Sequence, residues 1–228
     1  MTNRYEINDM AKEESWRLFR IMGELVEGFD MLTGVEPAVS IYGSARITAA
    51  DETYSSTDDI AYRLGMMGFN IITGGGPGVM EAANKGAARA GVMSIGLNIR
   101  LPEEQVANEY VTKSLLFHHF FVRKVMLVKY ATAFVIMPGG LGTLDELTEI
   151  LTLMQTQKIR PFPVVLFDSK FWGGFLDWIK DVVLCKRLIS EDDFNLLRVS
   201  DDPKEVAETV QNWYLKQELM ARKALASY

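Results

Sequence analysis

The stretch at residues 133–146, AFVIMPGGLGTLDE, decides the fold, because it joins a buried strand to a helix. The apolar run 133–137 predicts a β-strand, and the helical spacing of apolar residues predicts a helix over 144–151. Three residues of the turn between them lack a Cβ atom: Gly139, Gly140 and Gly142. Such a turn can bind a phosphate through bare backbone N–H groups and the positive end of the helix. Thr143 can add a hydroxyl and Glu146 a carboxylate, so the stretch indicates chemistry on a nucleotide or a sugar phosphate.

The same strand–glycine–helix pattern occurs twice more, with glycine-containing turns at 43–46 and 74–78. This alternation predicts an α/β fold, a doubly wound, Rossmann-like parallel sheet with helices on both faces. Such sheets bind ligands beyond the carboxyl ends of their strands, so the three turns are expected to converge on one site. The expected strands are 38–42, 70–73, 93–97, 133–137, 163–167 and 196–199. The expected helices are 53–65, a segment ending near 90, 117–130, 144–151, 171–184 and a C-terminal helix with Pro203 in its first turn.

Residues 1–36 lie outside this alternation and are expected to form an N-terminal helical extension, while residues 37–228 form a single Rossmann-like nucleotide-binding domain. Large apolar residues of the extension recur three or four positions apart and form one stripe on a helix: Trp16, Phe19, Met22, Val26 and Phe29. Two interpretations of the stripe stay open. The helix packs on its own domain, or it contributes to an interface between subunits.

The composition excludes several classes of protein. A chain of 228 residues with 48% hydrophobic content can bury one core, and no apolar run approaches the roughly 18 residues that span a bilayer. The formal net charge of −6 argues against a nucleic-acid partner. The N-terminal sequence lacks the apolar core of a signal peptide, and the single cysteine, Cys185, is consistent with a reducing cytoplasm. His118 and His119 are adjacent and are expected to point to different sides of a helix, so no metal site is predicted.

The glycine turn at 74–78, GGGPG, lacks the signatures of the common nucleotide-binding loops. Its glycines do not have the G-x-G-x-x-G spacing of dinucleotide sites, and no Lys-Ser or Lys-Thr follows it as in a Walker A loop. A mononucleotide therefore fits the turn better than NAD or ATP.

The segment 138–146, PGGLGTLDE, matches the PGGxGTxxE signature of the Lonely Guy family. The pair Arg-Lys at 123–124 matches the Arg-Lys pair of that family, and the segments 73–81 and 42–46 resemble its two earlier loops. The resemblance extends from about residue 39 to 199 in matching order. It implies a phosphoribohydrolase that cleaves the N-glycosidic bond of AMP or an N6-modified AMP of the cytokinin riboside monophosphate type. The products would be the free base and ribose 5-phosphate, although many relatives carry the older label of lysine decarboxylase.

The resemblance also assigns roles to individual residues. Catalysis falls to Arg123 and Glu146. The phosphate would be bound by Gly139, Gly140, Gly142 and Thr143, with help from Gly75 and Gly76. Three further positions match ligand-contacting residues of the family: Glu104, Lys124 and Thr152. The resemblance implies no cofactor, a nucleoside monophosphate as the small-molecule partner, and a homodimer or higher homo-oligomer.

Three alternatives compete with this interpretation. Thr143 and Glu146 also fit a capping box, a purely structural pattern at a helix start. A decarboxylase would need pyridoxal phosphate held by a lysine, and no lysine is marked for that role. A non-enzymatic carrier of a nucleotide or of the molybdenum cofactor is the third, because such carriers resemble this fold and its glycine loops. The segments Phe120–Val122 and Ser44–Arg46 depart from the plant-type pattern, so the preferred base (prenylated adenine, plain adenine or another) stays open.

Overall fold

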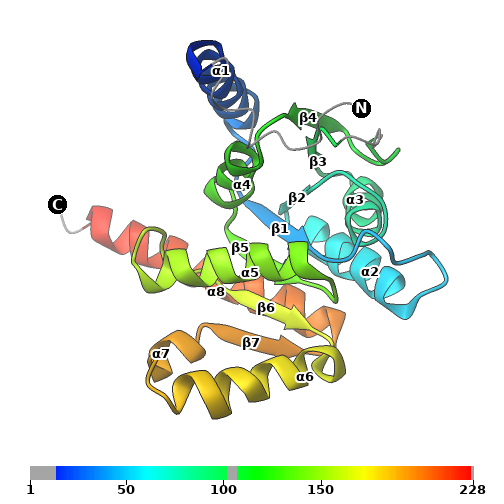
Figure 1. Ribbon diagram of the computed structural model, residues 1–228. Helices are drawn as coiled ribbons and strands as arrows, with labels where there is room; N and C mark the ends of the chain where they lie inside the picture. The colour runs from blue at the N-terminus through cyan, green and yellow to red at the C-terminus, as the bar shows by residue number, and fades with distance from the viewer. Residues whose placement is uncertain (1–13, 102–106, 227–228) are drawn as a thin grey trace, which may run out of the picture.

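The computed structural model describes residues 14–101 and 107–226, which form a seven-stranded sheet with helices on both sides (Figure 1). Its strands are β1 (Ala38–Tyr42), β2 (Asn70–Thr73), β3 (Ser94–Ile99), β4 (Lys113–Phe117), β5 (Ala133–Ile136), β6 (Val164–Phe167) and β7 (Leu197–Ser200). Its helices are α1 (Glu14–Leu32), α2 (Glu52–Met66), α3 (Val79–Ala90), α4 (Phe120–Lys129), α5 (Leu141–Gln155), α6 (Ser169–Trp178) with its π-helical continuation η2 (Ile179–Leu184), α7 (Glu191–Phe194) and α8 (Pro203–Ala226). All neighbouring strands are parallel, in the order β4-β3-β2-β1-β5-β6-β7. The expected doubly wound α/β fold is confirmed.

Successive residues of the strands enter two separate cores, one on each face of the sheet. In β1, Val39 and Ile41 pack with residues of α2, α3 and α8. Ala38 and Tyr42 pack with residues of α4, α5 and α6. Figure 1 shows α4 and α5 on one side of the sheet and α2 and α3 on the other. Because both faces are covered, the strands read as continuous apolar runs, and this made them recognisable in the sequence.

Short acidic side chains start two of the late helices. Asp168 accepts hydrogen bonds from the N–H groups of Lys170 and Phe171 at the start of α6, each at 3.1 Å. Asp202 accepts a hydrogen bond from the N–H of Lys204 at 2.8 Å, and Pro203 is the first residue of α8. The expected start of the C-terminal helix at Pro203 is therefore confirmed.

Strand β4 and the single turn α7 were not expected from the sequence. In β4, which lies at the edge of the sheet, Leu115 and Phe117 are buried and Leu116 between them is exposed. This alternation marks a strand with one covered face. The helix predicted over 117–130 begins only at Phe120, because Phe117 belongs to β4.

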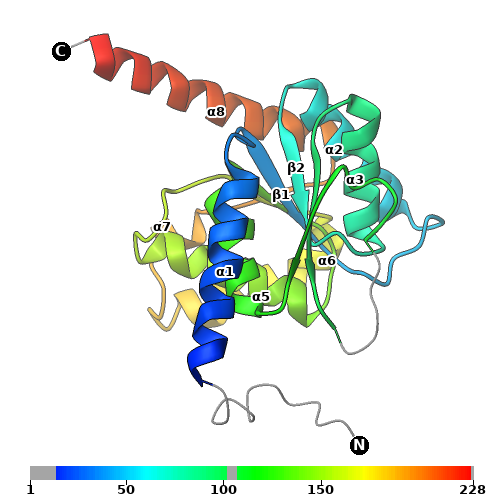
Figure 2. The ribbon, with the colours of Figure 1, turned by 90° about the horizontal axis from the view of Figure 1, so that it is seen from above.

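Helix α1 packs on α4 through a face largely opposite to its apolar stripe. A Cβ atom on Gly28 would lie 2.6 Å from Cε of Met126, so the two helices approach closely there. The stripe itself is exposed, from 39% at Phe29 to 71% at Trp16. The helix therefore packs on its own domain, as one of the two interpretations expected, but it does so through its other face and leaves the stripe exposed. In Figure 2, α1 runs across the near side of the molecule, and the C-terminal part of α8 extends beyond the sheet.

Within residues 14–101 and 107–226, no helix is long and apolar enough to cross a membrane, and no three His, Cys, Asp or Glu side chains are grouped so that they could hold a metal ion.

Candidate active site

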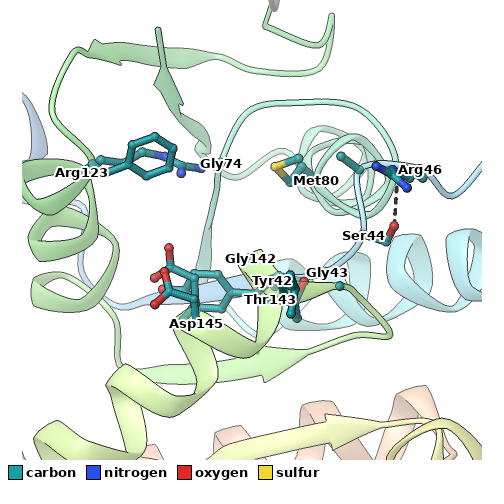
Figure 3. Close-up of a pocket in the computed structure, with 16 residues that line it drawn as sticks. Tyr42, Gly43, Ser44, Arg46, Gly74, Met80, Arg123, Gly142, Thr143 and Asp145 are labelled. Carbon is teal, nitrogen blue, oxygen red and sulfur yellow. Dashed lines mark hydrogen bonds between the residues drawn. The ribbon is translucent and has the colours of Figure 1, made fainter. Parts of the chain in front are cut away.

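A pocket opens at the carboxyl ends of β1 and β2, beside the start of α5. Strand β1 has β2 on one side and β5 on the other, so the pocket lies where the order of the strands reverses. Its volume is about 620 Å³, and its wall combines the turn after β1, Gly74 after β2 and the first turn of α5 (Figure 3). The expected convergence of the three glycine turns on one site is confirmed.

Helix α5 places its first N–H groups at this pocket. Gly140 is the N-cap, and its carbonyl oxygen accepts hydrogen bonds from the N–H groups of Thr143 and Leu144, each at 3.0 Å. The N–H groups of Leu141 and Gly142 come too early in the helix to have an intrahelical acceptor. An anion at this end would be favoured both by these donors and by the helix dipole.

The three glycines at the start of α5 are needed for two different structural reasons. A Cβ atom on Gly139 would collide with the side chain of Thr143, so this glycine lets the turn close; it is not part of the pocket wall. A Cβ atom on Gly140 or Gly142 would meet no atom within 4 Å. Both of these residues line the pocket, and their missing side chains leave room there for a ligand.

The capping-box interpretation of Thr143 and Glu146 is wrong. The N-cap of α5 is Gly140, and Thr143 is already the third residue of the helix. Glu146 therefore lies in the second turn, beyond the position from which a glutamate reaches back to the N-cap backbone.

Glu146 is a buried carboxyl group in the pocket wall. Glu146 is only 8% exposed, and its Oε2 atom has no hydrogen-bond partner among the described residues. Burial raises the pKa of Glu146 to about 7, although the positive charges of Lys124 and Arg123 oppose this shift. Burial and the charge of Glu146 also raise the pKa of Tyr42, another residue of the wall, well above its ordinary value. A carboxyl group with a pKa near neutrality can take up or release a proton at physiological pH.

Arg123 projects from the first turns of α4 toward the loop after β2 (Figure 3). Its Nε–H donates a hydrogen bond to the carbonyl oxygen of Leu97 at 2.6 Å. Its guanidinium lies so close to Gly74 that a Cβ atom there would collide with it. Burial lowers the pKa of Arg123, and the charge of Glu146 opposes this shift. Because arginine stays protonated in proteins, the pocket holds a fixed positive charge whose field reaches Glu146.

The loop after β2 is held by a network of buried and half-buried polar side chains that no sequence motif revealed. The side-chain amide of Asn108 donates hydrogen bonds to the carbonyl oxygens of Gly75, at 3.2 Å, and Gly76, at 3.0 Å. The same amide donates to Oδ1 of Asn84 at 3.0 Å, which also accepts from the hydroxyl of Thr73 at 2.7 Å. Gly75 and Gly76 are therefore fixed within the loop and lie outside the pocket wall.

Three residues that the resemblance marked as ligand contacts are not part of the described pocket wall. The Nζ atom of Lys124 pairs with the carboxylates of Asp145, at 2.9 Å, and Glu149, at 3.1 Å. Thr152 is exposed further along α5 and lines a separate cavity between α5 and α6. Glu104 lies outside the described residues.

His118 and His119 lie in the turn between β4 and α4, and both rings contact one carboxylate. Each Nδ1 atom lies 3.1 Å from Oε1 of Glu24 in α1. The expectation that the two rings point to different sides is wrong, because both residues precede the helix, which begins at Phe120.

Comparison with known proteins identifies relatives over most of the chain. A family model described as "Possible lysine decarboxylase" matches residues 80–210, more than half of the chain. The cytokinin riboside 5′-monophosphate phosphoribohydrolase LOG of Oryza sativa subsp. japonica is 28% identical over 172 residues, which cover 72% of this chain and 70% of the rice protein. The pyrimidine/purine nucleotide 5′-monophosphate nucleosidase of Escherichia coli strain K12 is 27% identical over 163 residues, which cover 67% of this chain but 36% of the E. coli protein.

Solved structures share the fold. The molybdenum cofactor binding protein from Rippkaea orientalis superposes with a TM-score of 0.55 at 22% identity, over 78% of this chain and 95% of that one. The molybdenum cofactor carrier protein from Chlamydomonas reinhardtii gives a TM-score of 0.57 at 20% identity, over 77% and 96%. At these identities the likeness concerns the fold alone. The family match, by contrast, runs from the start of α3 into α8 and includes the first turns of α4 and α5, and this chain therefore belongs to the Lonely Guy (LOG) family, whose model bears the lysine decarboxylase description.

Proposed function

We propose that this protein is a nucleoside 5′-monophosphate phosphoribohydrolase, which releases the free base and ribose 5-phosphate. The substrate is AMP or an N6-modified AMP of the cytokinin riboside monophosphate type. The names of the rice and E. coli relatives, both of which refer to nucleoside 5′-monophosphates, support this proposal. The observation that carries it is the buried carboxyl group of Glu146, whose Oε2 lacks a partner among the described residues and whose pKa is raised to about 7.

In the proposed reaction, Glu146 acts on the water that replaces the base at C1′ of the ribose. Cleavage of a glycosidic bond passes through an oxocarbenium-like state, which a nearby carboxylate stabilises. As the C1′–N bond breaks, the water oxygen bonds to C1′ and the water gives a proton to the Glu146 carboxylate. The base leaves with the bonding electron pair and takes up a proton from solvent. Loss of the proton from Glu146 to solvent restores the starting state.

The first turn of α5 supplies the phosphate site in this proposal. The N–H groups of Leu141 and Gly142 and the hydroxyl of Thr143 are the donors, and Gly140 provides the space. Gly139 contributes indirectly, because it lets Thr143 take its place. Gly75 and Gly76 contribute to the site indirectly as well, because they belong to the loop after β2 that begins at Gly74 in the pocket wall.

We expect AMP to be hydrolysed and adenosine to be a poor substrate. Adenosine lacks the phosphate, and each charge-assisted hydrogen bond that it forgoes contributes about 1.5–3 kcal/mol. The value of kcat/KM for adenosine should therefore be at least about tenfold lower than for AMP. The measurement is the base released from a panel of nucleosides and their 5′-monophosphates, including N6-prenylated AMP. Equal turnover of adenosine and AMP would contradict the phosphate site, and the ranking of the monophosphates identifies the preferred base.

Two alternative functions, a carrier and a decarboxylase, do not account for all the features of this pocket. A carrier of a nucleotide or of the molybdenum cofactor needs the phosphate-binding turn, but it has no use for a carboxyl group with a pKa of about 7 in the wall. A pyridoxal-dependent decarboxylase needs a lysine that reaches the cofactor. No lysine belongs to the pocket wall among the described residues, and Lys124 is paired with carboxylates of α5.

We also propose that the chain forms a homodimer or higher homo-oligomer through α1. The apolar side chains of its stripe are exposed, and large exposed apolar patches mark sites of interaction with other proteins. Helix α4, on which α1 packs, adds three further exposed apolar side chains: Phe120, Phe121 and Val125. A second copy offers the same apolar surface, and twofold contacts between identical patches are the commonest kind of protein assembly.

In light scattering at micromolar concentration, we expect at least twice the mass of one chain. Val26→Glu places a charge in the middle of the stripe and should shift the mass to that of a monomer. Leu188→Glu is the matched control, because Leu188 is as exposed as Val26 (68% against 65%) but lies between η2 and α7, and α7 is far from α1 in Figure 1. A monomeric mass for the unaltered chain would contradict the proposal.

A further inference from the structure

Helix α1 contains a carboxylate that is buried against the start of α4. Glu24 is only 8% exposed, although most of the described residues of α1 are exposed. Its Oε1 accepts a hydrogen bond from the N–H of His118 at 3.1 Å, and its Oε2 accepts one from the N–H of His119 at 3.3 Å. Both oxygens of the carboxylate are thus committed to the backbone just before α4.

This contact resembles the part of a capping box in which a glutamate accepts a hydrogen bond from the N–H of the N-cap residue. His119 is the N-cap of α4, and its own side chain makes no capping hydrogen bond. A carboxylate at the N-terminal end of a helix satisfies free N–H groups and interacts favourably with the helix dipole. Glu24, from a different helix, binds the N–H groups of the N-cap residue and of the residue before it, and places its negative charge at the positive end of the α4 dipole.

The two histidine rings fix the carboxylate in place. Nη1 of Arg100, just after β3, lies 3.1 Å from Nε2 of His118. Arginine can only donate, so Nε2 of His118 accepts and its Nδ1 carries the hydrogen that is donated to Glu24 at 3.1 Å. The ring of His119 contacts the same Oε1 atom at 3.1 Å. Glu24 therefore links α1, the end of β3 and the turn that leads into α4.

The turn that Glu24 holds is bonded directly to Arg123. The N–H of Arg123 donates a hydrogen bond to the carbonyl oxygen of His119 at 3.2 Å. The side chain of Arg123 reaches the pocket from this same backbone and is anchored to Leu97 by its Nε–H. A displacement of the turn would thus move the guanidinium relative to Gly74 and Glu146.

We propose that Glu24 is a positioning residue of the active site: it holds the first turn of α4, and through it the guanidinium of Arg123, in the geometry that the reaction needs. The proposal rests on the role given to Arg123 in the proposed function. It makes the N-terminal helix a support of the site, although α1 lies outside the part of the chain matched by the family model.

A double-mutant cycle tests whether Glu24 acts through Arg123. Glu24→Ala should lower kcat for AMP hydrolysis about tenfold, whereas Glu24→Gln, which keeps an oxygen acceptor, should recover part of the loss. In an Arg123→Gln background, Glu24→Ala should cost less than about twofold. The matched control is Glu27→Gln, an exposed glutamate on the same helix, which should leave kcat unchanged. An equal fold loss with and without Arg123 would overturn the proposal.

Hydrogen–deuterium exchange gives a readout that does not depend on the reaction. In Glu24→Ala, and more weakly in Glu24→Gln, the backbone amides of residues 118–123 should exchange faster, while those of α5 should keep their rates. Unchanged exchange at 118–123 in both variants would overturn the proposal, whether or not AMP is the substrate. Absence of base release by the unaltered protein, together with faster exchange at 118–123 in the variants, would instead refute the proposed function and support the role of Glu24 in holding α4. If Glu24→Ala does not fold, Glu24→Gln decides both measurements.

Discussion

Glu146→Gln should lower the turnover of AMP by roughly 10²- to 10⁴-fold, the range expected when a positioned acid–base group is lost. Glutamine keeps the shape of the side chain but cannot take a proton from water or offset positive charge on the ribose. Binding of AMP should survive, because the donors in the first turn of α5 are unchanged. The measurements are base release under saturating AMP and the dissociation constant for AMP of the variant.

At alkaline pH, Glu146→Gln should be more stable to unfolding than the unaltered protein. In the folded protein the pKa of Glu146 is raised from 4.5 to about 7, so between these values the folded state binds more protons than the unfolded chain. The free energy of unfolding therefore decreases as the pH rises through this window, by up to about 3 kcal/mol. Glutamine avoids this cost, so the melting temperature of the variant should exceed that of the unaltered protein by several degrees at about pH 8. The difference should shrink as the pH falls toward 4.5.

Glu149→Gln is the matched control for both measurements. Glu149 lies about one turn further along α5 and pairs with Lys124 outside the pocket wall, so its loss should leave turnover at alkaline pH nearly unchanged. A Glu146→Gln protein that still hydrolyses AMP at the normal rate would remove the central residue from the mechanism, and the carrier alternative would then gain support.

The central part of the fold could be predicted because its strands are buried on both faces. β1 and β2 were predicted with the bounds that they have, and β5 to within one residue, since a fully covered parallel strand is a short apolar run followed by a turn. Edge strand β4 was missed because it alternates exposed and buried residues and runs into the histidine pair before α4. For α1, helical spacing revealed an apolar stripe but could not tell which of two apolar faces meets the domain.

The candidate site could be predicted as far as its motifs extend. The sequence placed Glu146 and Arg123 together, and both line the pocket. Sequence reasoning missed Asn84 and Asn108, which hold the second glycine loop from positions 24 residues apart, because such a contact has no local pattern. It missed Glu24 for a physical reason as well: a glutamate on an amphipathic helix is normally solvated, and only the fold shows that this one is buried.

Arg123→Gln should lower the maximal rate of AMP hydrolysis by roughly 10²- to 10³-fold and also change its pH dependence. The guanidinium is a fixed positive charge of the pocket wall, to which Arg46 also belongs, and its loss removes a group that can orient the phosphate or the reacting sugar. Its charge also lowers the pKa of Glu146, which burial otherwise raises. Without Arg123, Glu146 should hold its proton more tightly, so the acidic limb of the pH–rate profile should move to higher pH, by roughly one unit.

The two effects of Arg123 can be separated by comparison with Lys124→Gln. The ammonium of Lys124 also lowers the pKa of Glu146, but Lys124 is not part of the described pocket wall and is paired with Glu149 and with Asp145, which lines the pocket. Its loss should move the acidic limb in the same direction while the plateau at alkaline pH falls much less than in Arg123→Gln. Lys129→Gln, at the far end of α4, should change neither the limb nor the plateau. If Arg123→Gln moved the limb but kept the full plateau, Arg123 would act only on the pKa of Glu146, and its proposed direct role in the reaction would be refuted.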